Sequence, residues 1–433
     1  MESSERISYP DYVRLLRTNA NFRRLWFAQI VSEIGDWMYT VAIYAQLLRL
    51  TGLASSISFA FILQVLPQAL VSPMAGVLND RVSRRRLMII ADLARAGIVA
   101  LMLLAQYRQM IWLIYMLLFL ETVFWALFEP GRSAVIPNIT ARRETLVANS
   151  LSSTTWSFNF AVGFAIGGVI AAFAGRDFVF LLNSASFLVS AALLSGMKFV
   201  EPHLRDQPVL RVRELFDFSP VAEGLRYVSR DKRLLATMFV KCGLGVMGAN
   251  WTLVTILGER KFRVAAPGMD AISAGMLGMS LLMAARGLGA LIGPTLGAYF
   301  AGHAEHRMRA AITLGFAMGA AGYLLLGLAP NMLLAGACLV LAHGGGSIIW
   351  VFSTTLLQMN TDDKFRGRVF SAEFAFMTIS LAASNALAGS ALDAHAPLEA
   401  VVSMTGAAML VPGLLWFLAQ RLWQRPAMSP SPS

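Results

Sequence analysis

The hydrophobic residues of this chain gather in twelve blocks of about twenty to thirty residues, and short polar links separate the blocks. An α-helix rises about 1.5 Å per residue, so a block of about twenty residues can cross the roughly 30 Å hydrocarbon core of a membrane. The pattern therefore predicts an all-α membrane protein with twelve transmembrane helices, near residues 22–50, 54–78, 86–106, 111–136, 146–174, 178–200, 234–258, 271–300, 308–328, 331–358, 369–392 and 398–420.

The longest polar stretch, residues 201–233, divides the blocks into two sets of six. It carries seven Lys and Arg residues and an amphipathic piece at 221–228, and both features are typical of a cytoplasmic linker. We therefore expect a six-helix bundle over 1–200, a linker over 201–233 and a second six-helix bundle over 234–420. The Pro- and Ser-rich end, 421–433, is expected to be a disordered cytoplasmic tail.

A short repeated element links the two sets of blocks. Block two ends with a Pro-x-x-Gly element at Pro73 and Gly76, and block eight ends with the same element at Pro294 and Gly297. A basic cluster follows each element, at 84–86 and at 306–309. The same element at the same place in both halves indicates a duplication, and hence two pseudo-symmetric bundles.

Composition and charge narrow the class of partner. Hydrophobic residues make up 57% of the chain and charged residues 14%, whereas a soluble domain has about 25% charged residues. The formal net charge of +11 is compatible with binding nucleic acid or an anionic membrane surface. Most Lys and Arg residues lie in the links on one side of the predicted helices, as the positive-inside rule requires. We therefore expect a multi-pass protein of the bacterial inner membrane, in contact with the lipid bilayer, with both termini cytoplasmic and no nucleic-acid partner.

The sequence lacks the motifs of an enzyme or a metal site. Cys242 and Cys338 fall in different predicted helices, which argues against a disulfide framework or a Cys-x-x-Cys site. The glycines at 344–346 have no phosphate-loop context, since no Gly-Lys-Ser/Thr follows them. The N-terminal 24 residues lack a cleavable signal pattern, so the first helix is expected to direct insertion. We expect no enzyme activity, no cofactor and no metal, and a monomeric protein.

Several stretches resemble a known transporter family. Residues 76–86 resemble the major facilitator signature Gly-x-Leu-x-Asp-Arg-x-x-Arg-Arg, with Ser83 in place of the usual turn glycine. Residues 163–168 resemble the antiporter signature Gly-Pro-x-x-Gly-Gly, with Phe164 in place of the proline. The stretches 32–37, 128–134 and 366–369 resemble the branch that holds enterobactin exporters, macrolide efflux proteins and lysophospholipid transporters. The resemblance covers most of the chain from Asn19 to Leu392.

This resemblance implies the major facilitator fold, with two six-helix bundles around a central cavity and alternating access. It also implies export of a small amphipathic molecule, such as a siderophore, an antibiotic or another natural product, by proton antiport. No ATP-binding motif is present in the sequence, so a gradient is expected to supply the energy. An alternative is movement of lysophospholipid between membrane leaflets, and a more distant one is a membrane sensor that does not transport.

Ionisable side chains within the apolar blocks are candidates for the substrate cavity and for proton coupling, because charge inside hydrocarbon is costly. Glu33 and Asp36 are three residues apart in the first block, which places both carboxyl groups on one side of a helix. A low-dielectric setting favours the neutral form that a proton carrier needs. Alternatively, Asp36 only pairs with Arg286 or with a neighbouring amide. Glu121 lies in the middle of the fourth block among Phe119, Phe124, Trp125 and Phe128.

Three further candidates lie in the second half of the chain. Arg286 is near the centre of the eighth block, too deep to reach the surface, so it requires an acidic partner, an anionic substrate or water. Lys241 lies closer to the cytoplasmic end of the seventh block, where its side chain can extend to the membrane surface. His343 is either a proton relay or, as we favour, a satisfied packing residue.

A second group of residues is expected to form a cytoplasmic gate: Gly76, Asp80, Arg81, Arg84, Asp92, Arg132, Arg366 and Glu373. Asp80 is expected to face the N-terminus of the eleventh helix at 366–369, where the helix dipole favours a carboxylate, with Arg132 as its second partner. Asp92 and Arg95 are expected to form a gate ion pair with the basic loop. Glu373 is given the same role.

Overall fold

The computed structural model describes residues 9–105, 107–204, 219–265, 267–302 and 304–423, and these residues form helices and connecting turns without β-strands. The α-helices are α1 (Tyr9–Thr18), α2 (Ala20–Thr51), α3 (Ala54–Arg81), α4 (Arg84–Leu101), α5 (Ile111–Ile139), α6 (Arg142–Ala174), α7 (Arg176–Ser195), α8 (Ser219–Val228), α9 (Lys232–Leu244), α10 (Asn250–Ile256), α11 (Ala271–Ala301), α12 (Glu305–Gly327), α13 (Met332–Met359), α14 (Asp363–Asp393) and α15 (Leu398–Ala419). The prediction of an all-α fold is confirmed.

Eleven helical segments of the described residues are long and apolar enough to cross a membrane. The remaining helix of the twelve predicted is α2, which has 32 residues and therefore a length of about 48 Å. Its apolar sequence is interrupted by Glu33 and Asp36, together with Gln29 and Gln46. The length of α2 fits a membrane span, and its polar side chains set it apart from the other eleven.

The seventh predicted block is broken into several helical segments instead of one continuous helix. A 3₁₀ segment, η5 (Gly245–Ala249), joins α9 to α10, and a π-helical turn, η6 (Leu257–Lys261), follows α10. A Cβ atom added at Gly248 would collide with the backbone of Leu381 in α14, so the glycine permits close packing of the two helices. Ser384 of α14 donates to the carbonyl of Val246 at 2.5 Å and satisfies a carbonyl at this break.

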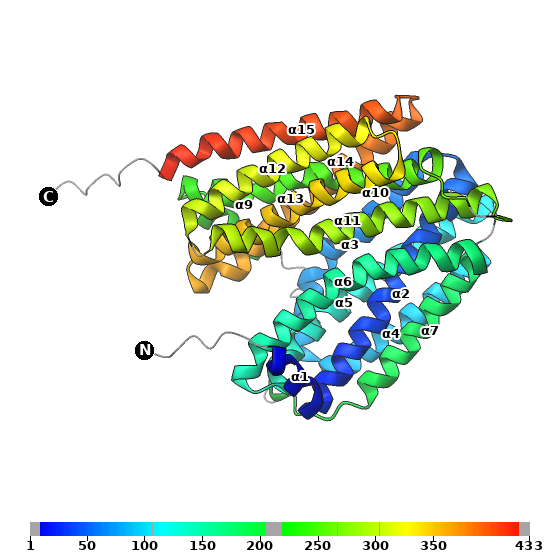
Figure 1. The fold of residues 1–433 in the computed structure, drawn as a ribbon. Coiled ribbons are helices and arrows are strands. Elements are labelled where there is room, and N and C mark those ends of the chain that lie inside the picture. Colours follow the sequence, from blue (N-terminus) through cyan, green and yellow to red (C-terminus); the bar gives the residue numbers. More distant parts are fainter. Residues whose placement is uncertain (1–8, 106, 205–218, 266, 303, 424–433) are drawn as a thin grey trace. The chain divides into compact units, whose positions relative to one another are not determined.

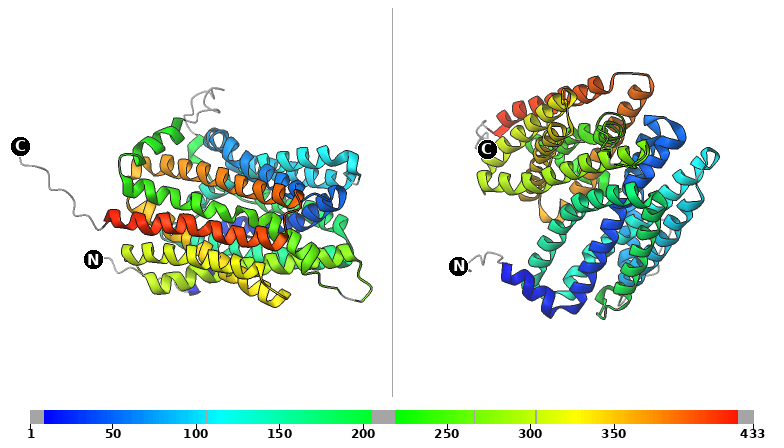
Figure 2. Two further views of the ribbon diagram at one scale, coloured as in Figure 1. Left: turned by 90° about the horizontal axis from the view of Figure 1, so that it is seen from above. Right: turned by 45° about the vertical axis from the view of Figure 1, so that its right-hand side comes forward.

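The described chain divides into two compact units (Figures 1 and 2). Unit 1 consists of the described residues within 1–217 and 254–284, and unit 2 of the described residues within 218–253 and 285–433. Within unit 1, α2 packs against α6 and α7, α4 against α5 and α7, and α3 against α5. Within unit 2, α12 packs against α13 and α15, and α14 against α8 and α9. Division of the chain at the predicted linker stays a prediction.

Glycine contacts fix α2 between two neighbouring helices. A Cβ atom at Gly163 of α6 would lie 2.6 Å from Cβ of Trp37, and one at Gly167 would lie 2.6 Å from Cα of Met38. On the other side, a Cβ atom at Gly35 would collide with the side chain of Asn183 in α7. These glycines therefore determine which neighbours Glu33 and Asp36 of α2 meet.

Two short helices lie outside the apolar blocks. The predicted amphipathic piece at 221–228 is confirmed as part of α8. Helix α1 was not predicted. It buries Leu15 in a cluster with Val147 and Ala148 of α6, and the hydroxyl groups of Tyr12 and Ser150 lie 3.0 Å apart. The tail residues 424–433 and the linker residues 205–218 lie outside the described part of the chain.

Candidate functional site

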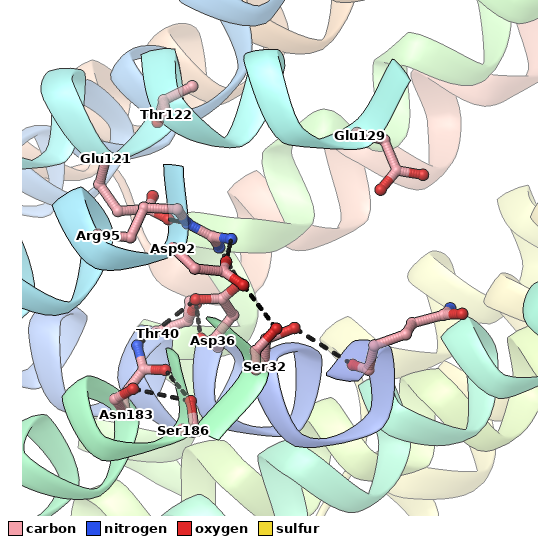
Figure 3. A network of polar contacts seen from close by, with 12 residues as sticks. Ser32, Asp36, Thr40, Asp92, Arg95, Glu121, Thr122, Glu129, Asn183 and Ser186 are labelled. Atoms are coloured by element: carbon pink, nitrogen blue, oxygen red, sulfur yellow. Dashed lines mark hydrogen bonds and ion pairs between the residues drawn. The ribbon is translucent and has the colours of Figure 1, made fainter. Parts of the chain in front are cut away.

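The guanidinium group of Arg95 lies at the centre of a buried charge cluster in unit 1 (Figure 3). Arg95 belongs to α4, and only 1% of its surface is exposed. It donates to the carboxyl group of Asp36 in α2, and its Nε donates to Oε1 of Glu121 in α5 at 3.0 Å. Its Nη1 lies 3.6 Å from Oδ1 of Asp92, one turn earlier in α4. Three acidic side chains from three helices therefore share one cation.

Neutral side chains hold the acids of this cluster in position. Asn183 of α7 donates to Oδ1 of Asp36 at 3.4 Å, and the hydroxyl group of Ser190 donates to Oδ2 of Asp92 at 2.6 Å. The guanidinium carbon of Arg95 lies 4.0 Å from the ring centre of Phe187. An aromatic face close to a guanidinium group stabilises the cation while it excludes water. Helix α7 thus contributes no charge to the cluster, although it orients two of its carboxyl groups.

The charges in this cluster do not balance. If Asp36, Asp92 and Glu121 were all ionised, one Arg95 would leave two negative charges uncompensated in a buried site. Charge that is neither paired nor hydrated is strongly unfavourable in a low-dielectric interior. The arrangement is therefore suited to binding exchangeable protons.

The sequence analysis missed the main partners of Arg95. We expected Asp92 and Arg95 to form a gate ion pair with the basic loop. The two residues do form an ion pair at 3.6 Å, but Arg95 also pairs with Asp36 and Glu121. The residue lies eleven positions after the start of α4, which is about 16 Å along the helix axis. Asp36 is bound by Arg95 and also by a neighbouring amide, that of Asn183, as one of the sequence alternatives predicted. The other alternative, a pairing of Asp36 with Arg286 of unit 2, stays a prediction.

Glu33 belongs to a different network from Asp36, although both residues lie on α2. Gln29 donates to Oε1 of Glu33 at 3.0 Å, and Asn159 of α6 donates to Oε2 at 2.8 Å. Gln29 also accepts from Nη1 of Arg132 at 3.1 Å, and Arg132 in turn binds Glu129 through two hydrogen bonds. The structure therefore joins Asp36 and Glu121 through Arg95, and it places Glu33 with Arg132.

The gate residues of unit 1 are found in separate contacts. Asp80 forms an ion pair with Arg84 at 3.3 Å, and its side chain is 71% exposed. The expected pairing of Asp80 with Arg132 was wrong, since Arg132 binds Glu129 and Gln29. A Cβ atom at Gly76 would meet no atom of the described residues of unit 1 within 4 Å.

One contact near the gate was not anticipated from the sequence. The carboxyl group of Glu201 accepts the backbone N–H of Arg84 at 2.7 Å and therefore caps the start of α4. Arg81, the last residue of α3, lines a surface pocket together with Arg85 and Glu201. The expected contact of Asp80 with residues 366–369, which belong to the other unit, stays a prediction.

Two of the cavity candidates, Arg286 and His343, lie in unit 2. His343 is buried, and its Nε2 lies 3.0 Å from the hydroxyl group of Tyr323, a pair that agrees with the packing role we favoured. The guanidinium carbon of Arg286 lies 4.5 Å from the ring centre of Trp251. An aromatic face thus takes part in accommodating this deep cation.

Lys241 and Glu373 form a buried ion pair in unit 2. The ammonium group of Lys241 lies 2.8 Å from Oε2 of Glu373 and 4.5 Å from the ring centre of Trp350. Lys241 does not use the reach to the membrane surface that the sequence allowed, because its side chain is 6% exposed and held by Glu373. Arg366, the other gate candidate here, donates to backbone carbonyls, including that of Gln358 at 3.2 Å. The gate roles of Glu373 and Arg366 stay predictions.

Among the described residues, no group of three or more His, Cys, Asp or Glu side chains is placed to hold a metal ion. Cys242 and Cys338 are free thiols.

Comparison with known proteins identifies a family and two similar proteins that are named for the molecules they export. The model of the family described as transmembrane secretion effector matches residues 16–432. The enterobactin exporter EntS of Citrobacter koseri is 25% identical, over 93% of this chain and 92% of that protein. Macrolide efflux protein A of Streptococcus pyogenes is 27% identical, over 51% of this chain and 54% of that protein.

Among solved structures, a POT family transporter in complex with 5-aminolevulinic acid superposes with a TM-score of 0.73. The match covers 93% of this chain and 97% of that chain, at 11% sequence identity. At this identity the likeness concerns the fold alone. The two chains share the same fold.

Proposed function

Because the chain belongs to the transmembrane secretion effector family of major facilitator transporters, we propose that it exports a small amphipathic molecule from the cytoplasm in exchange for protons. Two relatives support the proposed substrate class, one an enterobactin exporter and the other a macrolide efflux protein. The proposed substrate is a siderophore, an antibiotic or a related natural product. The proposed route is alternating access in the inner membrane, by a monomer with both termini in the cytoplasm.

The main support for proton coupling is the excess of acidic side chains over the single cation, Arg95, in this cluster. Asp36 and Glu121 each contact the guanidinium group from a different helix, and Asp92 lies 3.6 Å away. When two of the three acids bind protons, Arg95 balances the one carboxylate that remains, so proton binding brings the cluster to neutrality. Antiport requires that substrate and proton binding oppose each other energetically, and a cluster that redistributes its charge in this way meets that requirement.

Reconstituted protein tests the proposal. Purified protein in liposomes would be given an imposed pH gradient, and uptake of a catecholate siderophore, a macrolide and a lysophospholipid would be measured separately. We expect the gradient to drive one of the first two probes, and Asp36→Asn with Glu121→Gln to abolish that response. Thr122→Val is the matched control, because the Thr122 hydroxyl donates to the carbonyl of Leu118 in its own helix. A full response in the Asp36→Asn, Glu121→Gln protein would refute proton coupling here, and transport of lysophospholipid alone would replace the substrate class.

The proposed orientation has its own test. A cysteine at Ser229, directly after α8, is expected to react with a membrane-impermeant thiol reagent only from the cytoplasmic side. A cysteine at Ala265, before α11, is expected to react only from the outside. The opposite result at both positions would reverse the orientation, and with it the proposed direction of transport.

A further inference from the structure

The side-chain amide of Gln29 is fixed in one orientation by its partners. Its Oε1 accepts from the guanidinium group of Arg132 at 3.1 Å, and a guanidinium group can only donate. Its Nε2 donates to the backbone carbonyl of Ser152 at 3.0 Å, and a carbonyl can only accept. Rotation of the amide by 180° would place donor against donor and acceptor against acceptor. Gln29 is 1% exposed, so water cannot repair such a mismatch.

This orientation of the Gln29 amide determines that Glu33 acts as the hydrogen-bond acceptor toward Gln29. The remaining N–H of Gln29 points at Oε1 of Glu33, at 3.0 Å, so that oxygen must accept. The other oxygen, Oε2, accepts from Asn159 at 2.8 Å. Asn159 differs from Gln29, because its Oδ1 is buried and has no hydrogen-bond partner within the described part of the chain. Nothing on that side fixes the Asn159 amide in the orientation in which it donates.

We propose that Glu33 is a second proton-binding residue, that its proton resides on Oε2, and that Gln29 and Asn159 are the residues that position it. The Asn159 amide rotates by 180° when Glu33 binds the proton, and its Oδ1 then accepts from the new O–H. Gln29 cannot rotate, so Oε1 remains the acceptor in both states. The inference rests on the proposed function, because it names the residues that would position a coupling proton.

Protonation of Glu33 affects an ion pair near the end of α5. The charged groups that act on Glu33 are Arg132 and Glu129, both from α5. Helix α6 faces it with the neutral Asn159, and Asp36, one turn along α2, is engaged by Arg95 and by Asn183 of α7. With Glu33 ionised, Arg132 is attracted by two carboxylates. With Glu33 protonated, Glu129 alone balances Arg132, so the ion pair within the 128–134 stretch is strengthened.

Infrared difference spectroscopy of the purified protein tests this assignment without any transport measurement. A protonated carboxyl group absorbs in its own C=O region, and we expect one band that appears as the pH falls and is absent in Glu33→Gln. Gln29→Met removes a donor that binds the carboxylate of Glu33 more strongly than the neutral carboxyl group, so the proton affinity of Glu33 should rise by about tenfold or more. Asn159→Leu removes a partner of both forms, so the band should move to higher frequency while its pH midpoint changes little.

Ser32→Ala is the matched control, since the Ser32 hydroxyl bonds backbone carbonyls of its own helix. Equal rises in proton affinity in Gln29→Met and Asn159→Leu would overturn the amide rotation. A band set unchanged by Glu33→Gln would overturn Glu33 as a proton site. Thermal melting of each purified variant identifies those that do not fold, and Asn159→Leu keeps Glu33 itself in place. The gradient response of the Asp36 and Glu121 variants tests the proposed function, whereas the infrared bands test the assignment of Glu33. The two hypotheses can therefore fail independently.

Discussion

Replacing Arg95 by Met is the most direct test of the charge cluster in unit 1. The substitution keeps a long apolar side chain in α4 but removes the cation that faces Asp36, Asp92 and Glu121. The Arg95 side chain is 2% exposed, and two of the acids are within hydrogen-bond distance of it. Removal of one partner from a buried ion pair costs about 3–5 kcal/mol, because the remaining charge is left uncompensated. We therefore expect Arg95→Met to lower the unfolding free energy by about that amount.

The same reasoning predicts that replacing the acidic residues by neutral amides restores the stability lost in Arg95→Met. The triple variant Arg95→Met, Asp36→Asn, Glu121→Gln removes the cation together with the two acids it contacts most closely, so most of the stability should return. Unfolding of purified protein is measured with a thiol-reactive dye that reports exposure of Cys242 and Cys338, which lie within α9 and α13. An Arg95→Met protein that melts like the wild type, or a triple variant no more stable than the single one, would refute the paired arrangement.

Four other tests address separate parts of the structure. Gly163→Val should cost about 1–3 kcal/mol in thermal unfolding, because its Cβ would force α6 away from α2. Lys241→Met should destabilise unit 2 by about 3–5 kcal/mol, and Glu373→Gln in the same protein should restore much of the loss. Asp80→Asn should leave expression intact while transport falls sharply, and full transport would remove its gate role. The backbone N–H of Ser273, in the first turn of α11, donates to Asp270 and lowers the pKa of that carboxyl group. The cap therefore stabilises the fold fully above an ordinary aspartate pKa, and this stabilisation is lost as the pH falls through the lowered value. The difference in melting temperature between wild type and Asp270→Asn should disappear in acid.

The sequence was sufficient to predict the helices because span length is a direct consequence of membrane thickness. Each of the twelve apolar blocks coincides with a helix or a broken helical segment. The break in the seventh block was not predictable, since Gly245 and Gly248 are as compatible with an uninterrupted membrane helix as with the 3₁₀ turn that packs on α14. Helix α1 was missed because its apolar face is only a few residues long, at Tyr12, Leu15 and Leu16.

The candidate site was only partly predictable for a geometric reason. Residues three apart on a helix differ by about 60° around its axis, so Glu33 and Asp36 lie on one side but point to different neighbours. In the structure that difference is enough to direct Glu33 to α6 and Asp36 to α4 and α7. A sequence identifies buried charges by type, whereas their partners depend on the rotation of packed helices.

The two buried ion-pair groups differ in a way that locates the proposed proton coupling. Lys241 and Glu373 are one cation and one anion in contact, and this pair is neutral without any proton exchange. Arg95 faces three acids, so its cluster approaches neutrality only when protons bind. Replacement of Lys241 and Glu373 by the neutral pair Met and Gln should therefore leave the response to a pH gradient intact, whereas Asp36→Asn with Glu121→Gln should abolish it. If the first variant loses the gradient response while folding normally, coupling involves unit 2, and the charge imbalance around Arg95 is not its origin.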